Sequence, residues 1–99
     1  MLDTFITWAQ RVQSHTAGPS LKIQLTGNEE PENPSARLDF DSPFAIARIT
    51  FWNSGDYDAE VSARETGRTI YSGFGLIDEG RDLSHLFAPV FRALRVDLP

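Results

Sequence analysis

The chain has 99 residues, 40% of them hydrophobic, and a formal net charge of −5 at pH 7. This length fits one domain with one core, so we expect a single domain over residues 1–99 that folds unaided. Because the chain contains no cysteine, disulfides and thiolate chemistry are excluded. An anionic surface repels phosphates, which argues against nucleic acid and favours a basic protein surface as partner. The simpler alternative is that the charge only keeps a small domain in solution.

The start of the chain has no basic region ahead of an apolar run, and no stretch approaches the roughly 20 apolar residues of a membrane span. We therefore expect a cytoplasmic protein with no membrane partner.

The first predicted element is an amphipathic helix from Leu2 to about Thr16, because its apolar residues recur at helical spacing. Gly18 and Pro19 then end the helix. Strict alternation of apolar and polar residues predicts a strand over 20–26 and a second strand over 36–41. The loop signals between them, over 27–35, are Gly, Pro and Asn.

The segment 44–53 is the most strand-like part of the chain, because aromatic and branched residues fill it. Both of its faces carry apolar side chains, so we expect a central strand that is covered at least partly on each side. The turn over 53–56 predicts a hairpin to a return strand over 57–64. A weaker strand follows over 68 to about 74, where Gly73 and Gly75 suggest a bulge or a sharp bend.

Asp82 is a good N-cap for a C-terminal helix, whose apolar stripe is formed by Leu83, Leu86, Phe87, Val90, Phe91 and Leu94. Pro89 lies inside this stripe and predicts a kinked or split helix. Short connections make neighbouring strands antiparallel. The predicted fold class is therefore α+β, with an antiparallel sheet of about five short strands flanked by an N-terminal and a C-terminal helix.

No pattern in the sequence suits catalysis. His15 and His85 lack the spacing of a metal site, and the Gly-rich run 72–76 lacks the Lys and Ser/Thr of a phosphate loop. Carboxylates two apart on strands share a solvent-facing side rather than a cleft, namely Asp39 with Asp41, and Asp56 with Asp58 and Glu60. We expect no enzyme, no cofactor and no metal ion.

An interaction surface is the remaining interpretation. Acidic groups on turns and strands, with aromatic residues among them, suit a binder that presents both to a cationic cleft. The candidate partner-binding residues are Trp52, Asp56, Tyr57, Asp58, Glu60, Tyr71, Asp78 and Glu79. For each charge alone, the alternative is a solvated residue that guards a sheet edge.

The run 47–55, the return strand Tyr57–Val61 and the closing helix Leu83–Leu94 resemble the small immunity proteins of bacterial polymorphic toxin systems, and the TriTu immunity family in particular. The resemblance spans most of the chain. It implies a non-enzymatic inhibitor of an ADP-ribosyltransferase toxin, carried at the end of an Rhs-type effector and acting on elongation factor Tu. Such an inhibitor would block entry of NAD or of the target protein.

Three hypotheses follow. The first is a one-to-one complex in which this chain occludes the active site of a cognate antibacterial toxin and so protects the producing cell. The second is an adaptor domain unrelated to toxins, and the third is a hydrolase that removes ADP-ribose.

Overall fold

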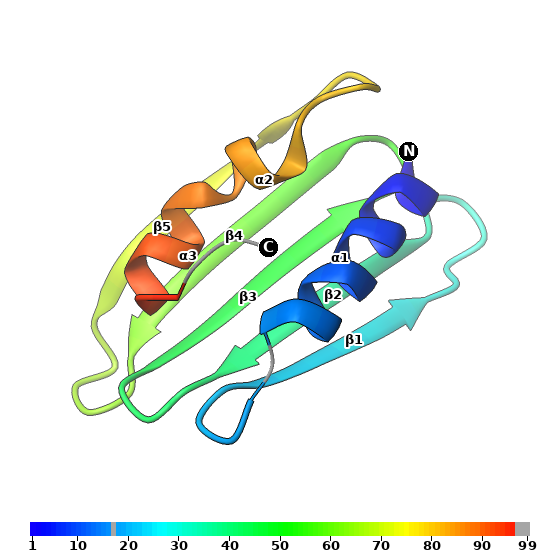
Figure 1. Cartoon of the computed structure of the whole chain (residues 1–99). Helices are drawn as coiled ribbons and strands as arrows, with labels where there is room; N and C mark the ends of the chain where they lie inside the picture. Colours follow the sequence, from blue (N-terminus) through cyan, green and yellow to red (C-terminus); the bar gives the residue numbers. More distant parts are fainter. Residues whose placement is uncertain (17, 97–99) are drawn as a thin grey trace.

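The computed structural model describes residues 1–16 and 18–96. The elements are α1 (Leu2–Thr16), β1 (Lys22–Asn28), β2 (Ser35–Asp41), β3 (Ala45–Trp52), β4 (Asp56–Ala63), β5 (Thr69–Leu76), α2 (Leu83–Leu86) and α3 (Ala88–Leu94). The strands follow chain order across one antiparallel sheet, and the helices lie together on one face of it (Figure 1). The predicted α+β class, the antiparallel sheet of five strands and the bounds of the first helix are confirmed.

The core lies between the sheet and the helices, because alternate strand residues point to the helical side. Phe5 of α1 stacks on Phe51 of β3, with ring centroids 4.9 Å apart. Phe91 of α3 meets the ring of Phe40 edge-on at 5.6 Å. The fully buried side chains from both layers form one cluster, which includes Phe5, Val12, Leu38, Phe40, Ile49, Phe51, Val61, Phe87, Val90, Phe91 and Leu94.

The strand β3 is central in the sheet, as predicted, but the expected partial cover of its second face is limited to Thr50 and Trp52, which are half-buried. Its alternate residues from Ala45 to Phe51 are buried under the helices, whereas Ile46 and Arg48 on the other face are exposed. The aromatic residue just before the strand, Phe44, lies in the turn, where the guanidinium of Arg95 covers its ring at 4.9 Å. Among the described residues, no helix therefore covers the second face of β3 (Figure 1).

Strand pairing moves two boundaries away from the local turn signals. Gly27 and Asn28 continue the ladder of β1 opposite Ala36 and Ser35, so this strand runs past its predicted end at Thr26. The strand β5 continues past its predicted end at about residue 74, to Leu76. In both cases the hydrogen bonds of a neighbouring strand outweigh the weak strand preference of Gly and Asn.

The glycines of β5 do not form the bulge that the sequence suggested. The register shifts instead between Val61 and Ser62 of β4. A Cβ atom on Gly73 would lie 2.5 Å from the Tyr71 hydroxyl, and one on Gly75 would lie 3.1 Å from the Tyr57 ring. These glycines therefore leave room for two tyrosines that lie on the helical side of the sheet.

The C-terminal helix is split, as predicted. Asp82 caps α2 by accepting hydrogen bonds from the amides of Ser84 and His85, and the break falls at Phe87. Pro89 lies in the first turn of α3, where its missing N–H leaves no helical hydrogen bond unmade. Within the described residues, none of the helices has the length and apolarity needed to cross a lipid bilayer.

Candidate interaction surface

The sheet face turned away from the helices, which we call the open face, carries charged side chains on β2, β3 and β4, among them Asp39, Arg48 and Glu60. Its rows run across the strands through paired residues. One row passes from Asp39 of β2 to Arg48 of β3 and Glu60 of β4, and the next passes from Thr50 to Asp58 and Phe74. Cations, carboxylates and apolar side chains on this face are therefore direct neighbours on adjacent strands.

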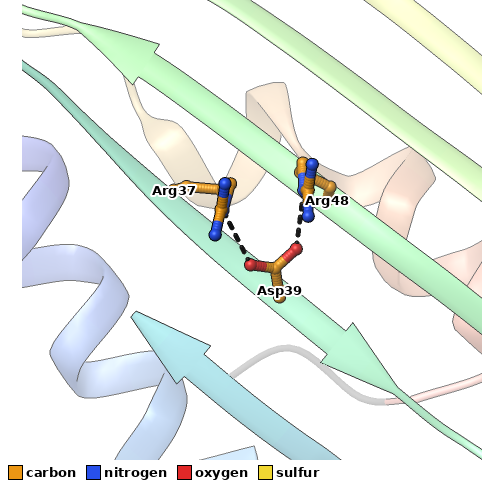
Figure 2. Close-up of polar contacts among 3 residues, drawn as sticks. All are labelled: Arg37, Asp39 and Arg48. Carbon is orange, nitrogen blue, oxygen red and sulfur yellow. Dashed lines mark hydrogen bonds and ion pairs between the residues drawn. The ribbon is translucent and has the colours of Figure 1, made fainter. Parts of the chain in front are cut away.

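On the β2–β3 side, the cations are already engaged within the chain. Asp39 accepts a hydrogen bond from Nε of Arg37 at 3.0 Å and another from Nε of Arg48 at 2.7 Å, as Figure 2 shows. One carboxylate thus bridges two guanidinium groups on neighbouring strands. Because both arginines are oriented toward Asp39, this side of the open face presents little uncompensated negative charge.

The β4 side of the open face is different, because its carboxylates have no cationic partner among residues 1–16 and 18–96. Asp56 accepts a hydrogen bond from the Ser54 hydroxyl at 2.6 Å, and Glu60 accepts one from the Ser62 hydroxyl at 3.4 Å. Between β3 and β4 lies a shallow hollow of about 310 Å³, lined in part by Thr50, Asp58 and Glu60. This row of carboxylates is available to a cation from another molecule.

Two large apolar side chains stand beside these carboxylates. Phe74 lies opposite Asp58 and Leu76 lies opposite Asp56 in the β4–β5 ladder. Phe74 is 82% exposed and Leu76 is 69% exposed. Single exposed apolar residues are common, whereas contiguous apolar patches rimmed by polar residues are often interaction sites.

The predicted partner-binding residues divide into three places. Trp52, Asp56, Asp58 and Glu60 come together on the open face, where Trp52 is half-buried. Tyr57 and Tyr71 lie on the helical side instead, packed against the core, and the Tyr57 ring meets that of Phe87 edge-on at 5.5 Å. Asp78 and Glu79 belong to the β5–α2 connection, where Glu79 pairs with the N-terminal amine at 3.6 Å. The structure therefore gathers half of the predicted set into one surface.

Phe74 and Leu76 were missed by the sequence reasoning, although a signal for them exists. Gly73 and Gly75 alternate with Phe74 and Leu76, so the glycines share one face of the strand and the two large apolar side chains share the other. Treating the glycines as breaks in the strand concealed this alternation.

A hollow of about 450 Å³ lies on the helical side, between α1 and the start of α2. It is lined by two acidic and two basic side chains, together with neutral ones: Asp3, Thr4, Thr7, Trp8, Arg11, Arg81, Asp82 and Leu83. The indole N–H of Trp8 is satisfied by the Ser84 hydroxyl at 2.9 Å, and Asp82 caps α2, so two of these groups are occupied in holding the fold. Within the described ranges, no three His, Asp or Glu side chains gather as a metal site would require.

The chain matches the family model described as Immunity protein TriTu over residues 3–93. The matched span contains all strands of the sheet and the whole open face. No individually curated protein matches the chain.

Proposed function

This chain belongs to the TriTu family of immunity proteins, and from that premise we propose that it binds a cognate antibacterial toxin and occludes the toxin's active site. The toxin that we propose is an ADP-ribosyltransferase domain, delivered by an Rhs-type effector of a type VI secretion system. Binding would be one-to-one and would take place in the cytoplasm of the producing cell. The match over residues 3–93 is the single observation that carries the immunity role.

The open face supports inhibition by binding. Unpaired carboxylates attract a cationic surface. The exposed aromatic and aliphatic groups beside them supply apolar surface that is removed from water when the complex forms. An enzyme that binds NAD must attract an anionic dinucleotide, and a cationic cleft suits that task. A protein that offers carboxylates to the same cleft competes directly with the dinucleotide.

A titration of toxin activity tests this proposal. Purified toxin domain is incubated with NAD and its target while this chain is added in rising amounts. Occlusion predicts that activity falls to zero at one equivalent and that added NAD shifts the curve only when the complex is weak. A hydrolase that removes ADP-ribose would instead restore the target at amounts far below one equivalent, and an adaptor unrelated to the toxin would leave activity unchanged.

Charge reversal locates the surface. The variant with Asp56, Asp58 and Glu60 all changed to Lys should lose affinity for the toxin while retaining the circular dichroism spectrum of the parent, because these side chains are exposed. A matched control changes three exposed residues of the β1–β2 loop to Lys, namely Glu29, Glu30 and Glu32, which alters net charge by the same amount.

Equal losses in the two variants would mean that only net charge matters, and an effect confined to the loop variant would move the interface to that loop. The affinity of the parent complex should also fall with added salt, and the β4 variant should be less sensitive to salt than the loop variant.

A further inference from the structure

The outer edge of the sheet at β5 is free. The amide of Ile77 donates to the carbonyl of Gly55 at 3.1 Å, so these two residues form a hydrogen-bonded pair at the end of the ladder. Hydrogen-bonded and non-hydrogen-bonded pairs alternate along an antiparallel ladder. Ser72, Phe74 and Leu76 are opposite Glu60, Asp58 and Asp56 in the non-hydrogen-bonded pairs. Their N–H and C=O groups therefore point away from β4, toward solvent.

Among the described residues, neither a second strand nor a side-chain hydrogen bond occupies this edge. The strands are paired in the order β1 to β5, which leaves β5 without a second neighbour. None of the side-chain hydrogen bonds found in residues 1–16 and 18–96 reaches the backbone of Thr69–Leu76. Unpaired main-chain groups in a row are a template for another strand.

The opposite edge, at β1, shows how this fold protects a strand. Lys22 places a charge within β1, and the side-chain amide of Gln13 donates to the carbonyl of Ile23 at 3.0 Å. The helix α1 supplies that amide, so one edge group of β1 is already occupied. Charged residues and covering segments are the usual means of blocking unwanted strand pairing.

By contrast, β5 contains no charged residue and no proline over its whole length, Thr69–Leu76. Its regular part begins after the register shift, and it carries the two most exposed large apolar side chains of the described chain, Phe74 and Leu76. An edge with these properties favours pairing with a strand of another molecule, so we expect it to serve in binding.

We propose that the toxin docks by adding an extended segment to the free edge of β5, so that the sheet continues into the partner. This proposal deepens the proposed function and rests on it, since it states how the cognate toxin is held. The segment pairs its main chain with Ser72, Phe74 and Leu76. On the open face, its alternate side chains are apolar, to pack on Phe74 and Leu76, or cationic.

The carboxylates of Asp56 and Asp58 on β4 are the reason why we expect cationic side chains on the added segment. Neighbouring strands lie about 4.8 Å apart, so an added strand lies about 10 Å from β4. An extended Lys or Arg on the added strand, together with an Asp on β4, spans that gap by passing over β5. The ring of Phe74 lies between such a cation and Asp58, and an aromatic face attracts a cation as well. Main-chain pairing gives affinity, and the match of cations to Asp56 and Asp58 gives selectivity.

A second copy of this chain is a poorer occupant than a cationic segment. Two copies each carry a formal net charge of −5 and repel one another, and β5 has no cation to offer the carboxylates of its twin. The edge thus selects a partner of opposite charge.

Amide hydrogen exchange measured by NMR, on the free chain and on its complex with the catalytically inactive toxin domain, tests the proposal directly. In the free chain, the amides of Tyr71, Gly73 and Gly75 point toward β4 and should exchange slowly, whereas those of Ser72, Phe74 and Leu76 should exchange fast. In the complex, the second set should slow by at least about tenfold. Unchanged exchange at these three amides overturns strand addition.

A pair of variants separates edge pairing from docking on the open face alone. Ser72→Pro removes an outward N–H and places the proline ring on the edge, while Ser72→Ala keeps the N–H and removes only the hydroxyl. Proline is compatible with an edge strand when its nitrogen faces away from the ladder. We expect Ser72→Pro to weaken toxin binding at least about 100-fold relative to Ser72→Ala, because several intermolecular hydrogen bonds are lost together.

Circular dichroism and urea unfolding confirm that both variants are folded. Affinities within threefold of each other in the two folded variants overturn the proposal and assign the interface to the open face alone. If Ser72→Pro unfolds the chain, amide exchange in the parent complex decides the question by itself.

The outcomes distinguish this proposal from the proposed function. If the parent chain neither binds nor inhibits the toxin domain encoded beside it, the proposed function fails. If it inhibits but the β5 amides stay unprotected, only strand addition fails. If analytical ultracentrifugation shows the chain alone to be a dimer that Ser72→Pro disrupts, the β5 edge pairs with a second copy. The proposal that the toxin pairs with this edge is then wrong.

Discussion

Two phenylalanines on opposite sides of the sheet test whether the helical face stabilises the fold while the open face is left for binding. Phe87, at the junction of α2 and α3, is 1% exposed and meets three aromatic rings, those of Phe5, Trp8 and Tyr57. Phe74, on β5, is 82% exposed. Replacement of each by Ala deletes the same phenyl ring. We expect Phe87→Ala to destabilise the protein severely and Phe74→Ala to leave its stability almost unchanged.

The magnitudes follow from burial. Complete burial of a Phe side chain contributes about 1.5–3 kcal/mol, and the cavity left by truncation adds to the loss, which brings Phe→Ala in a core to about 3–5 kcal/mol. Three lost aromatic pairs place Phe87 toward the upper end of this range. A domain of this size has a free energy of unfolding of about 5–15 kcal/mol, so the variant loses a large share of it. A surface substitution such as Phe74→Ala stays within about 0.5 kcal/mol.

Urea unfolding, followed by tryptophan fluorescence, measures both variants. Trp8 is in ring contact with Phe87, at a centroid distance of 5.5 Å, so it reports on the core directly. With a denaturant slope of about 2 kcal/mol per molar, Phe87→Ala should lower the urea midpoint by about 1.5–2.5 M. Phe74→Ala should move it by less than about 0.3 M while weakening toxin binding. Equal midpoint shifts in the two variants would refute the division of the sheet into a structural face and a binding face.

Three further changes test local features of the fold by thermal unfolding. Gly55→Ala should cost more than Gly67→Ala, because both glycines have positive φ but only at Gly55 would a Cβ meet a backbone oxygen, at 2.6 Å; Gly67→Ala alone should cost about 1–2 kcal/mol. Asp82→Ala removes the N-cap of α2 and should cost about 0.5–2 kcal/mol, whereas Asp82→Asn should retain most of the stability. Asp39→Ala should cost less than about 1 kcal/mol, since the arginines that it bridges are 44% and 56% exposed, and high salt should shrink the difference.

The fold could be predicted from the sequence largely because its two periodicities are clear. The helical spacing of α1 and the alternation in β2 and β4 each mark a single buried face, and the structure buries those faces. The weak points were strand ends and glycines. Whether Gly73 opens a bulge or makes room for a ring depends on the Tyr71 side chain above it, and that contact is fixed by packing rather than by local preference.

The candidate surface was only partly predictable for the same reason. Alternation correctly grouped Asp56, Asp58 and Glu60, but the residue types of Tyr57 and Tyr71 suggested binding while their positions on the strands placed them over the core. An amphipathic aromatic residue serves either purpose. Only the position of the helices decides which face of the sheet is free.

Alternation along β4 and β5 has a consequence for specificity. On β4, Ala59 and Val61 are buried under the helices, while Asp58 and Glu60, which alternate with them, face outward. A substitution at an outward position changes charge or shape toward a partner and leaves the core packing intact, because adjacent side chains lie on opposite sides of the sheet. An immunity protein must distinguish its own toxin from related ones, and it does so through differences in binding free energy. In the proposed complex, main-chain pairing at the β5 edge depends little on side chains, so the outward positions on β4 and β5 would set selectivity.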